Sequence, residues 1–243
     1  MLDPEEEQKY EQLSKLAQAL HIPMPQHFIE LEVRDKDGRV IQRHKQRSHS
    51  WTRNAYNLLF GTMAAKNLSD LTPDFGAGYL SIKIPTGIIR GAAAATSAPP
   101  SDNLDISGIS TYGGYLANAV IDTRGIVVGT GATAESFEDY KLDTPVAEGT
   151  GLGQLSHVAS ELHNITWPGG GLTMADAQVR YLNNNSGGAI VIAEVGIIIG
   201  VDVGGGLPNQ LALMSRDVLG ATVTVPDTGQ LKVTYTFELV YPA

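Results

Sequence analysis

The chain has no cysteine among its 243 residues, and this absence excludes several kinds of site at once. Disulfide bonds, iron–sulfur clusters, thiolate zinc sites and cysteine nucleophiles all require a thiol group. Basic residues are also scarce, because 17 lysines and arginines face 26 aspartates and glutamates, for a formal net charge of −9. Proteins that wrap nucleic acid need a basic face. We therefore expect no nucleic-acid partner.

Long hydrophobic runs are missing as well. The longest, residues 188–201, has about 14 residues, whereas a membrane-spanning helix needs roughly 20. Glu194 and three glycines interrupt this run, and its isoleucines and valines favour a buried strand. Residues 1–7 are acidic, unlike the basic start of a secretory signal peptide. The sequence thus predicts neither a membrane segment nor an export signal.

What is present is the pattern of a mainly β protein. From residue 79 onward, short apolar runs alternate with clusters of glycine, proline, serine and asparagine. The clearest strand is the last, because residues 231–241 alternate strictly between apolar and polar side chains after a turn at 227–229. Seven or more strands at this spacing predict an antiparallel β-sandwich, jelly-roll-like in arrangement. The expected strands are 29–34, 39–47, 79–84, 126–128, 155–167, 172–182, 189–201, 210–215, 221–225 and 231–241.

An amphipathic helix is predicted at the N-terminus. Asp3 supplies a capping side chain, Pro4 fits the first helical position, and the glutamates at 5–7 suit the helix dipole. The helix is expected to end before Pro23. Its apolar side chains recur at three- and four-residue steps and form one stripe, which we expect to lie on the chain's own domain or on a neighbouring subunit. The stripe comprises Tyr10, Leu13, Leu16, Ala17 and Leu20.

A second, short helix is expected at residues 51–65, capped by Ser48 or Ser50. Its apolar face comprises Trp51, Ala55, Leu58, Leu59 and Met63.

The order of these elements predicts two parts. Residues 1–25 form a docking arm, and residues 26–243 form a single β-sandwich domain. A loop rich in alanine, proline and glycine interrupts the domain at about 87–114. Connections of this length are usually functional or extended, so we expect the loop to lie across a neighbour or to move freely on the surface.

The predicted hairpin at 29–47 concentrates positive charge. Seven of the 17 basic residues lie between positions 34 and 53. Opposed acidic and basic patches suit head-to-tail contacts between copies or docking on an acidic partner. A solvated hairpin surface is the plain alternative, and a phosphate contact is the third. The side chains expected to contact a partner are Arg39, Arg43, Lys45, Arg47, Leu13, Leu16 and Leu20.

Residues 125–134 look like a strand entering the Gly-x-Gly-x-x-Ala loop of a dinucleotide-binding fold. That fold needs a helix next, because the N-terminus of the helix holds the pyrophosphate. Here residues 136–140 lead quickly to Pro145 and leave room for at most one turn. The sequence therefore does not favour nucleotide binding.

Two clusters have the residue types of metal sites. His157, Glu161 and His163 place two imidazoles and a carboxylate together if they share a strand face, although a polar strand face is the ordinary interpretation. Residues 102–105, Asp-Asn-Leu-Asp, offer oxygen ligands for calcium without the full spacing of a calcium loop. We therefore expect no metal, no cofactor and no catalytic residue. A carboxylate pair that converges only in three dimensions is the remaining route to an enzyme.

Three groups of residues resemble segments of virion structural proteins from tailed bacteriophages. They are 48–56 (SHSWTRNAY); 126–131 (IVVGTG) with 136–142 (SFEDYKL) and 144–146 (TPV); and 194–196 (EVG) with 213–219 (LMSRDVL) and the closing strand 231–241. Together they touch most of residues 48–242 in the same order, while the N-terminal helix and hairpin lie outside them.

This resemblance implies a non-enzymatic subunit, present in many copies on the particle and made in the host bacterial cytoplasm. We expect a homo-oligomer, a dimer or trimer, that contacts other virion proteins such as the major capsid protein. One hypothesis is a capsid decoration or auxiliary protein that binds the shell through its N-terminal region. The alternative is a tail, baseplate or fibre component that contacts the host surface. The presence of only two tryptophans, Trp51 and Trp167, favours the capsid.

Overall fold

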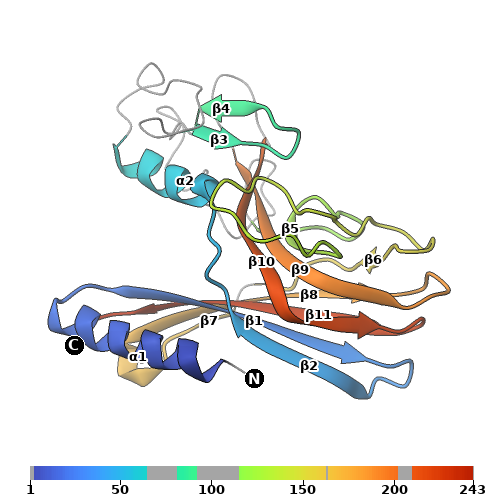
Figure 1. Ribbon diagram of the computed structural model, residues 1–243, viewed down its shortest axis with the longest axis horizontal. Helices are drawn as coiled ribbons and strands as arrows, with labels where there is room; N and C mark the ends of the chain where they lie inside the picture. Colours follow the sequence, from blue (N-terminus) through green and yellow to red (C-terminus); the bar gives the residue numbers. More distant parts are fainter. Residues whose placement is uncertain (1–2, 65–80, 92–114, 163, 202–209, 243) are drawn as a thin grey trace.

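The computed structural model describes residues 3–64, 81–91, 115–162, 164–201 and 210–242, and it shows a mainly β protein with antiparallel sheets (Figure 1). Two α-helices accompany the sheets in these ranges: α1 (Pro4–Ala19) and α2 (Arg53–Ala64). This arrangement confirms the predicted fold class, a β-sandwich-like fold with an N-terminal helix and one short internal helix.

The strands follow in chain order, with one short 3-10 turn, η3 (Gly169–Gly171), before β8. They are β1 (Met24–Arg34), β2 (Val40–Arg47), β3 (Ser81–Lys83), β4 (Ile89–Gly91), β5 (Gly125–Gly129), β6 (Ser156–His157), β7 (Asn164–Thr166), β8 (Thr173–Asn183), β9 (Ile190–Val201), β10 (Gln210–Val225) and β11 (Gln230–Val240).

The strands form two sheets and a small hairpin. The main sheet has the order β2-β1-β11-β8-β6, with β7 also paired to β8. The second sheet has the order β10-β9-β5, and β3 pairs with β4. All of these pairs are antiparallel. In Figure 1 the second sheet crosses above the main sheet, α2 and the β3–β4 hairpin lie at its upper end, and α1 lies along the main sheet.

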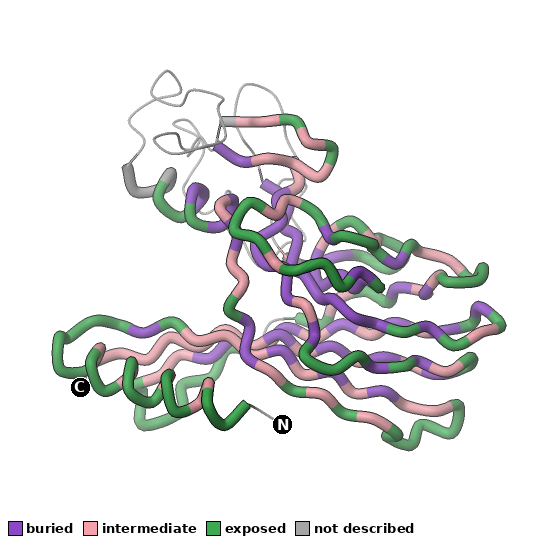
Figure 2. The backbone as a smooth tube through the Cα atoms, in the orientation of Figure 1, coloured by how far each residue is buried: buried purple, intermediate pink, exposed green. Residues whose placement is uncertain are grey.

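A hydrophobic core lies between the two sheets. β11 contributes Leu231, Val233 and Tyr235, which are fully buried, as the alternation of this strand predicts. The neighbouring strand β1 contributes Ile29 and Leu31 from its own alternating pattern. Figure 2 shows buried stretches along the strands of both sheets. Burial of such side chains is the main favourable term in the stability of the domain.

The same core extends into the second helix and the small hairpin. Ala55 and Leu58 of α2 and Ile82 of β3 belong to the cluster of buried side chains that fills the sandwich. These elements are therefore packed into the sandwich rather than forming a separate core.

Two glutamines join the edge strand β2 to the second sheet. The side chain of Gln42 donates to the carbonyl of Thr222 at 3.1 Å and accepts from the N–H of Thr224 at 2.9 Å. The side chain of Gln46 likewise donates to the carbonyl of Val218 at 3.1 Å and accepts from the N–H of Gly220 at 2.9 Å. These side-chain hydrogen bonds attach β2 to the irregular part of β10.

Three strand predictions were wrong in extent. The first strand, expected at 29–34, begins five residues earlier, because β1 pairs with β11 from Met24 onward. The sequence predicts one strand at 155–167, whereas β6 and β7 are separate. Between β6 and β7, the N–H of Val158 donates to the carbonyl of Tyr181, and the N–H of Glu161 donates to the carbonyl of Val179. Three residues of this segment therefore lie opposite two residues of β8, and the chain forms a β-bulge. The predicted strands 210–215 and 221–225 form one strand, β10, which shifts its register instead of ending.

The second helix was located correctly, but its cap was not. The hydroxyls of Ser48 and Ser50 bond to Asp217 and Glu135 rather than to the start of α2. Leu59, predicted on the packed face, is half exposed, because α2 presents only one side to the core. The side chain of Met63 lies outside the described residues.

The loop predicted at 87–114 begins as ordered structure. Residues 89–91 form β4 and pair with β3, which corrects the boundary of the loop. Residues 92–114, including the candidate calcium ligands at 102–105, lie outside the described residues.

Candidate functional site

Helix α1 is attached to the body by polar contacts. Asp3 caps its first turn, because Oδ1 accepts a hydrogen bond from the N–H of Glu5 at 2.8 Å. Glu7 pairs with Arg47 on β2, with 2.5 Å between Oε1 and Nε. The guanidinium of Arg47 also lies 4.0 Å from the ring centroid of Tyr10. No residue of α1 is buried, so the helix lies on the surface of the body rather than in its core.

The apolar stripe of α1 divides into two parts. Tyr10 and Ala17 are partly buried against the body. Leu13, Leu16 and Leu20, which we call the leucine row, are each more than half exposed. The chain's own described residues do not bury this row. Of the two expectations for the stripe, contact with the chain's own domain therefore holds for Tyr10 and Ala17, and contact with a neighbouring subunit stays a prediction.

Glutamates of β1 match the positive charges of β2. Nη2 of Arg43 lies 2.9 Å from Glu32, and Nζ of Lys45 lies 3.9 Å from Glu30. Glu32 also binds Arg34, and hydrogen bonds from both arginines lower the pKa of this carboxyl. The hairpin face that sequence reasoning treats as a basic patch is therefore largely neutralised within the chain.

Arg47 differs from its predicted role as a partner contact. Its side chain is buried, and it donates to Glu7 and to Oε1 of Gln26, the latter at 2.8 Å. It holds α1 in place and is not presented to a partner. Arg39 and Arg43 remain exposed at the turn and on β2.

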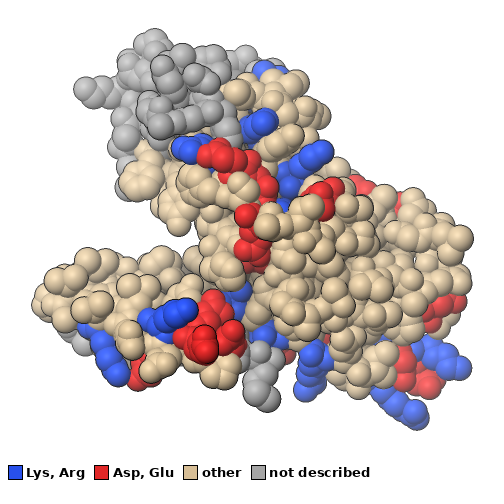
Figure 3. All heavy atoms as spheres, in the orientation of Figure 1, with Lys and Arg blue, Asp and Glu red and all other residues tan. Residues whose placement is uncertain are grey.

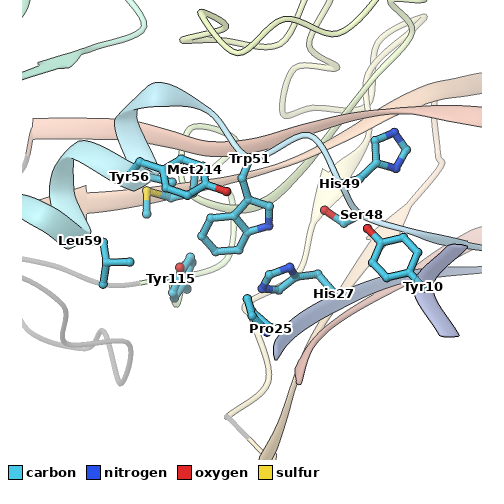
Figure 4. Close-up of a pocket in the computed structure, with 11 residues that line it drawn as sticks. Tyr10, Pro25, His27, Ser48, His49, Trp51, Tyr56, Leu59, Tyr115 and Met214 are labelled. Carbon is cyan, nitrogen blue, oxygen red and sulfur yellow. The ribbon is translucent and has the colours of Figure 1, made fainter. Parts of the chain in front are cut away.

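A pocket of about 420 Å³ opens in the cleft between α1 and α2. Figure 3 shows the cleft as a notch on the left of the molecule. Figure 4 shows Pro25 and His27 of β1 on one side of the pocket and Tyr56 and Leu59 of α2 on the other, with Trp51 between them. Most of the lining side chains are aromatic or aliphatic, as is usual for a site that binds an apolar group.

The interior of the pocket is electrically neutral. His27 packs against Trp51, with 4.5 Å between ring centroids, and against Phe237 at 5.4 Å. Burial lowers the pKa of His27 to about 4, so its imidazole is uncharged at pH 7. At the rim, a hydrogen bond with Glu135 raises the pKa of His49. The pocket therefore suits an uncharged group more than an ion.

Behind the pocket, Asp217 of β10 holds the linker between β2 and α2. Its Oδ2 accepts from Ser48 Oγ at 2.8 Å, and its Oδ1 accepts from the N–H groups of His49, at 3.1 Å, and Ser50, at 3.4 Å. Ser48 also bonds to the hydroxyl of Tyr235. Burial raises the pKa of Asp217 to about 7, so this carboxyl changes charge near neutral pH.

A carboxylate of the chain itself fills the glycine-rich loop after β5. Glu194 is fully buried and accepts hydrogen bonds from the N–H groups of Gly131, Asp143 and Thr144, at 3.3, 3.1 and 2.8 Å. A Cβ at Gly129 would lie 2.3 Å from Oε1 of Glu194. These glycines make room for Glu194, and the N–H groups that a phosphate would need are already occupied.

The structure does not bring together the described members of the candidate histidine cluster, His157 and Glu161. His157 is buried, with Nδ1 2.9 Å from Glu148, whereas Glu161 is exposed on the far side of the bulge. His163 lies outside the described residues. Burial lowers the pKa of His157. In the ranges that the structure describes, no three histidine, aspartate or glutamate side chains gather as metal ligands.

Sequence reasoning missed two residues that organise the loop before β5. Arg180 is fully buried on β8 and bonds to main-chain carbonyls. Val120 has a positive φ of 63° and is exposed. The position of Arg180 on the inward-facing side of an alternating strand is a signal that the sequence does contain, but the backbone conformation of Val120 leaves no trace in the pattern.

Comparison with known proteins gives no relative. No family model, no curated protein and no solved structure matches the chain. None of the helices in the described ranges is long and apolar enough to cross a membrane.

Proposed function

We propose that the chain is a non-enzymatic structural subunit of a tailed bacteriophage particle, a capsid decoration or auxiliary protein that associates with copies of itself and binds the shell through its N-terminal region. The leucine row of α1 carries this proposal. It presents three large apolar side chains on a helix that has no buried residue of its own. Apolar groups displayed in this way mark an interaction site.

The arrangement of the phage-like segments also supports the proposal. Residues 48–56 and 213–219 lie together in the fold, because Thr52 donates its N–H to Met214 at 2.9 Å and Arg216 donates its N–H to Ser50 at 3.2 Å. Two segments that resemble phage virion proteins thus form one structural unit, which carries the pocket and the start of α2.

The position of the protein on a particle is the direct test. Antibody raised against the chain is applied to tailed phage particles from the strain that carries the gene and is viewed by electron microscopy. Label on the head supports a decoration or auxiliary protein, and label on the tail supports the alternative. Absence of label from intact particles, together with absence of the chain from their mass-spectrometric protein list, overturns the proposal.

The role of the leucine row is tested on the purified full chain. We expect light scattering to give a defined dimer or trimer, and we expect the chain to co-sediment with empty heads of the same phage. The triple variant L13S/L16S/L20S should lose co-sedimentation, whereas L152S, which changes an exposed leucine far along the chain, should keep it. Retention of binding by the triple variant would assign attachment to another surface.

One observation favours the second candidate, a tail or fibre component that contacts the host surface. Trp167 and Tyr241 stack with their rings 13° from parallel and 6.5 Å between centroids, and Trp167 is more than half exposed. A flat aromatic platform of this kind suits the apolar face of a sugar ring. Loss of binding to host-cell polysaccharide in W167A would support this candidate, and the head label described above would exclude it.

A further inference from the structure

A buried arginine holds the loop at residues 118–124 in one conformation. Arg180 of β8 is fully buried, and burial lowers the pKa of its guanidinium to about 10. The guanidinium donates to five main-chain carbonyls: those of Asn118 at 3.5 Å, Ile121, Arg124 at 2.8 Å, Ile126 at 2.9 Å and Val158 at 3.1 Å. Burying a cation is costly, and here it is used to fix a surface loop.

At the tip of this loop, Val120 adopts a conformation that valine rarely adopts. Its φ is +63°, and its N–H donates to the carbonyl of His157 at 2.9 Å, which keeps the turn closed. Glycine and asparagine take this conformation at much lower cost than a β-branched residue. Strain of this kind persists only where the surroundings impose it, and it gathers at functional positions.

The strained residue is also an exposed apolar one. Val120 is 63% exposed, and two further branched side chains beside it, Ile121 and Val158, are exposed as well. We call these three residues the loop tip. A positive φ disfavours valine, and so does exposure of its apolar side chain to water. We therefore infer that the Val120 side chain contacts another molecule.

The chain also carries a cavity of matching chemistry. The pocket between α1 and α2 has a volume of about 420 Å³, is lined mainly by aromatic and aliphatic groups, and has an uncharged imidazole in its wall. The loop tip is likewise uncharged and apolar. Every copy of the chain presents both surfaces. The uncharged, apolar loop tip of one copy therefore matches the uncharged, apolar pocket of another copy.

We propose that the loop tip of one copy inserts into the pocket of a second copy, and that this contact is the basis of self-association. The proposal deepens the proposed function, on whose self-associating subunit it rests. Each copy offers a tip and accepts one, so the contact repeats around a closed ring or along a chain of subunits. Because each subunit carries a net charge of −9, salt should strengthen the contact by screening repulsion.

Two single variants test the two surfaces separately. V120N keeps a residue that tolerates a positive φ and removes the apolar side chain. L59E places a charge at the mouth of the pocket on a side chain that is already half exposed. Each variant should weaken self-association at least tenfold, as measured by light scattering across a dilution series. V120N should melt no lower than the wild type, since it relieves strain, and the matched control L152S should associate as the wild type does.

Mixing the two variants provides the decisive test. V120N retains an intact pocket and L59E retains an intact tip, so an equimolar mixture should form a complex that neither variant forms alone. Failure of the mixture to associate, or wild-type association by either single variant, would overturn this inference while leaving the proposed function in place. A wild-type chain that stays monomeric at every concentration would overturn both this contact and the self-association in the proposed function, whereas particle labelling would still report on the virion assignment.

Discussion

Arg216 and Glu194 form a buried ion pair across the two long strands of the second sheet. Nε of Arg216 lies 2.7 Å from Oε2 of Glu194, and neither side chain is more than 2% exposed. Each partner also binds the loop after β5: Glu194 accepts from the N–H of Thr144 at 2.8 Å, and Arg216 donates to Asp139 at 2.9 Å. The pair therefore fixes residues 129–144 to the second sheet.

Removing the carboxylate of Glu194 should destabilise the protein strongly. In E194L, Arg216 stays buried without this partner, and the N–H groups that Glu194 satisfies lose their acceptor. We expect the free energy of unfolding in urea to fall by about 3–5 kcal/mol. E194Q keeps the shape and one acceptor oxygen, so its loss should be smaller. Equal losses in the two variants would mean that the negative charge, which both variants remove, stabilises the loop, and that the acceptor oxygen kept by glutamine adds nothing.

The sequence predicts the regular parts of this fold well, because they follow from local patterns. The alternation along β11 identifies its buried residues, and the proline and capping aspartate at the start of α1 locate that helix. The same patterns fail where long-range contacts decide the outcome. The chain continues through the bulges of β10 because Gln42 and Gln46 bond to it from another strand, and no local rule contains that information.

The candidate site is only partly visible in the sequence for a similar reason. The leucine row follows from helical spacing, whereas the neutralisation of Arg43 depends on the register that brings Glu32 beside it. The pocket collects residues from α1, β1, α2 and β10. Asp217 binds the linker at residues 48–50, which is distant in sequence. Neither this contact nor the burial that raises the pKa of Asp217 can be predicted from the neighbouring residues.

Asp217 and His27 should make stability depend on pH in opposite directions. Burial raises the pKa of Asp217 from 3.8 to about 7, so its contribution to stability is complete below pH 3.8 and is lost as the pH rises through about 7. Burial lowers the pKa of His27 from 6.5 to about 4, so its contribution is complete above pH 6.5 and is lost as the pH falls through about 4. Between these limits the two effects offset each other.

Single variants should separate the two effects in urea unfolding between about pH 4 and pH 6.5. In D217N the effect of His27 remains, so relative to the wild type the free energy of unfolding should rise with pH, by up to about 3 kcal/mol. In H27Q the effect of Asp217 remains, so relative to the wild type it should fall by a similar amount. Glu135 and His49, which face Asp217, titrate in all three proteins. If the free energy of unfolding depends on pH in the same way in all three proteins, the prediction that Asp217 and His27 act in opposite directions is wrong.

Arg180 should contribute to stability mainly through the loop that it holds. R180M removes the donors for the carbonyls of Asn118, Ile121, Arg124 and Val158, which lie at or near the surface, and for that of Ile126, which is buried. We expect a loss of about 3 kcal/mol or more, together with faster hydrogen exchange at the N–H of Val120. The matched change R39M, at an exposed arginine, should cost less than about 0.5 kcal/mol. A normal exchange rate in R180M would show that the loop is held by other contacts.

Deleting residues 1–22 should leave the β body folded. No residue of α1 is buried, whereas Met24 is buried and pairs with Val240, so the deletion has to stop before β1. The truncated chain loses the Glu7–Arg47 ion pair, but Arg47 then gains water, and the loss of stability should stay within about 2 kcal/mol, as measured by thermal unfolding.

Two full-length variants test whether polar contacts alone hold the helix. E7Q removes the charge that binds Arg47 and should increase amide exchange throughout α1, whereas E11Q, which removes only the exposed pair with Lys15, should not. If the truncated chain fails to fold, α1 belongs to the core of its own domain. A folded truncated chain with an intact β-sheet spectrum means instead that the leucine row adds nothing to the stability of the isolated subunit, as the proposed attachment role of α1 requires.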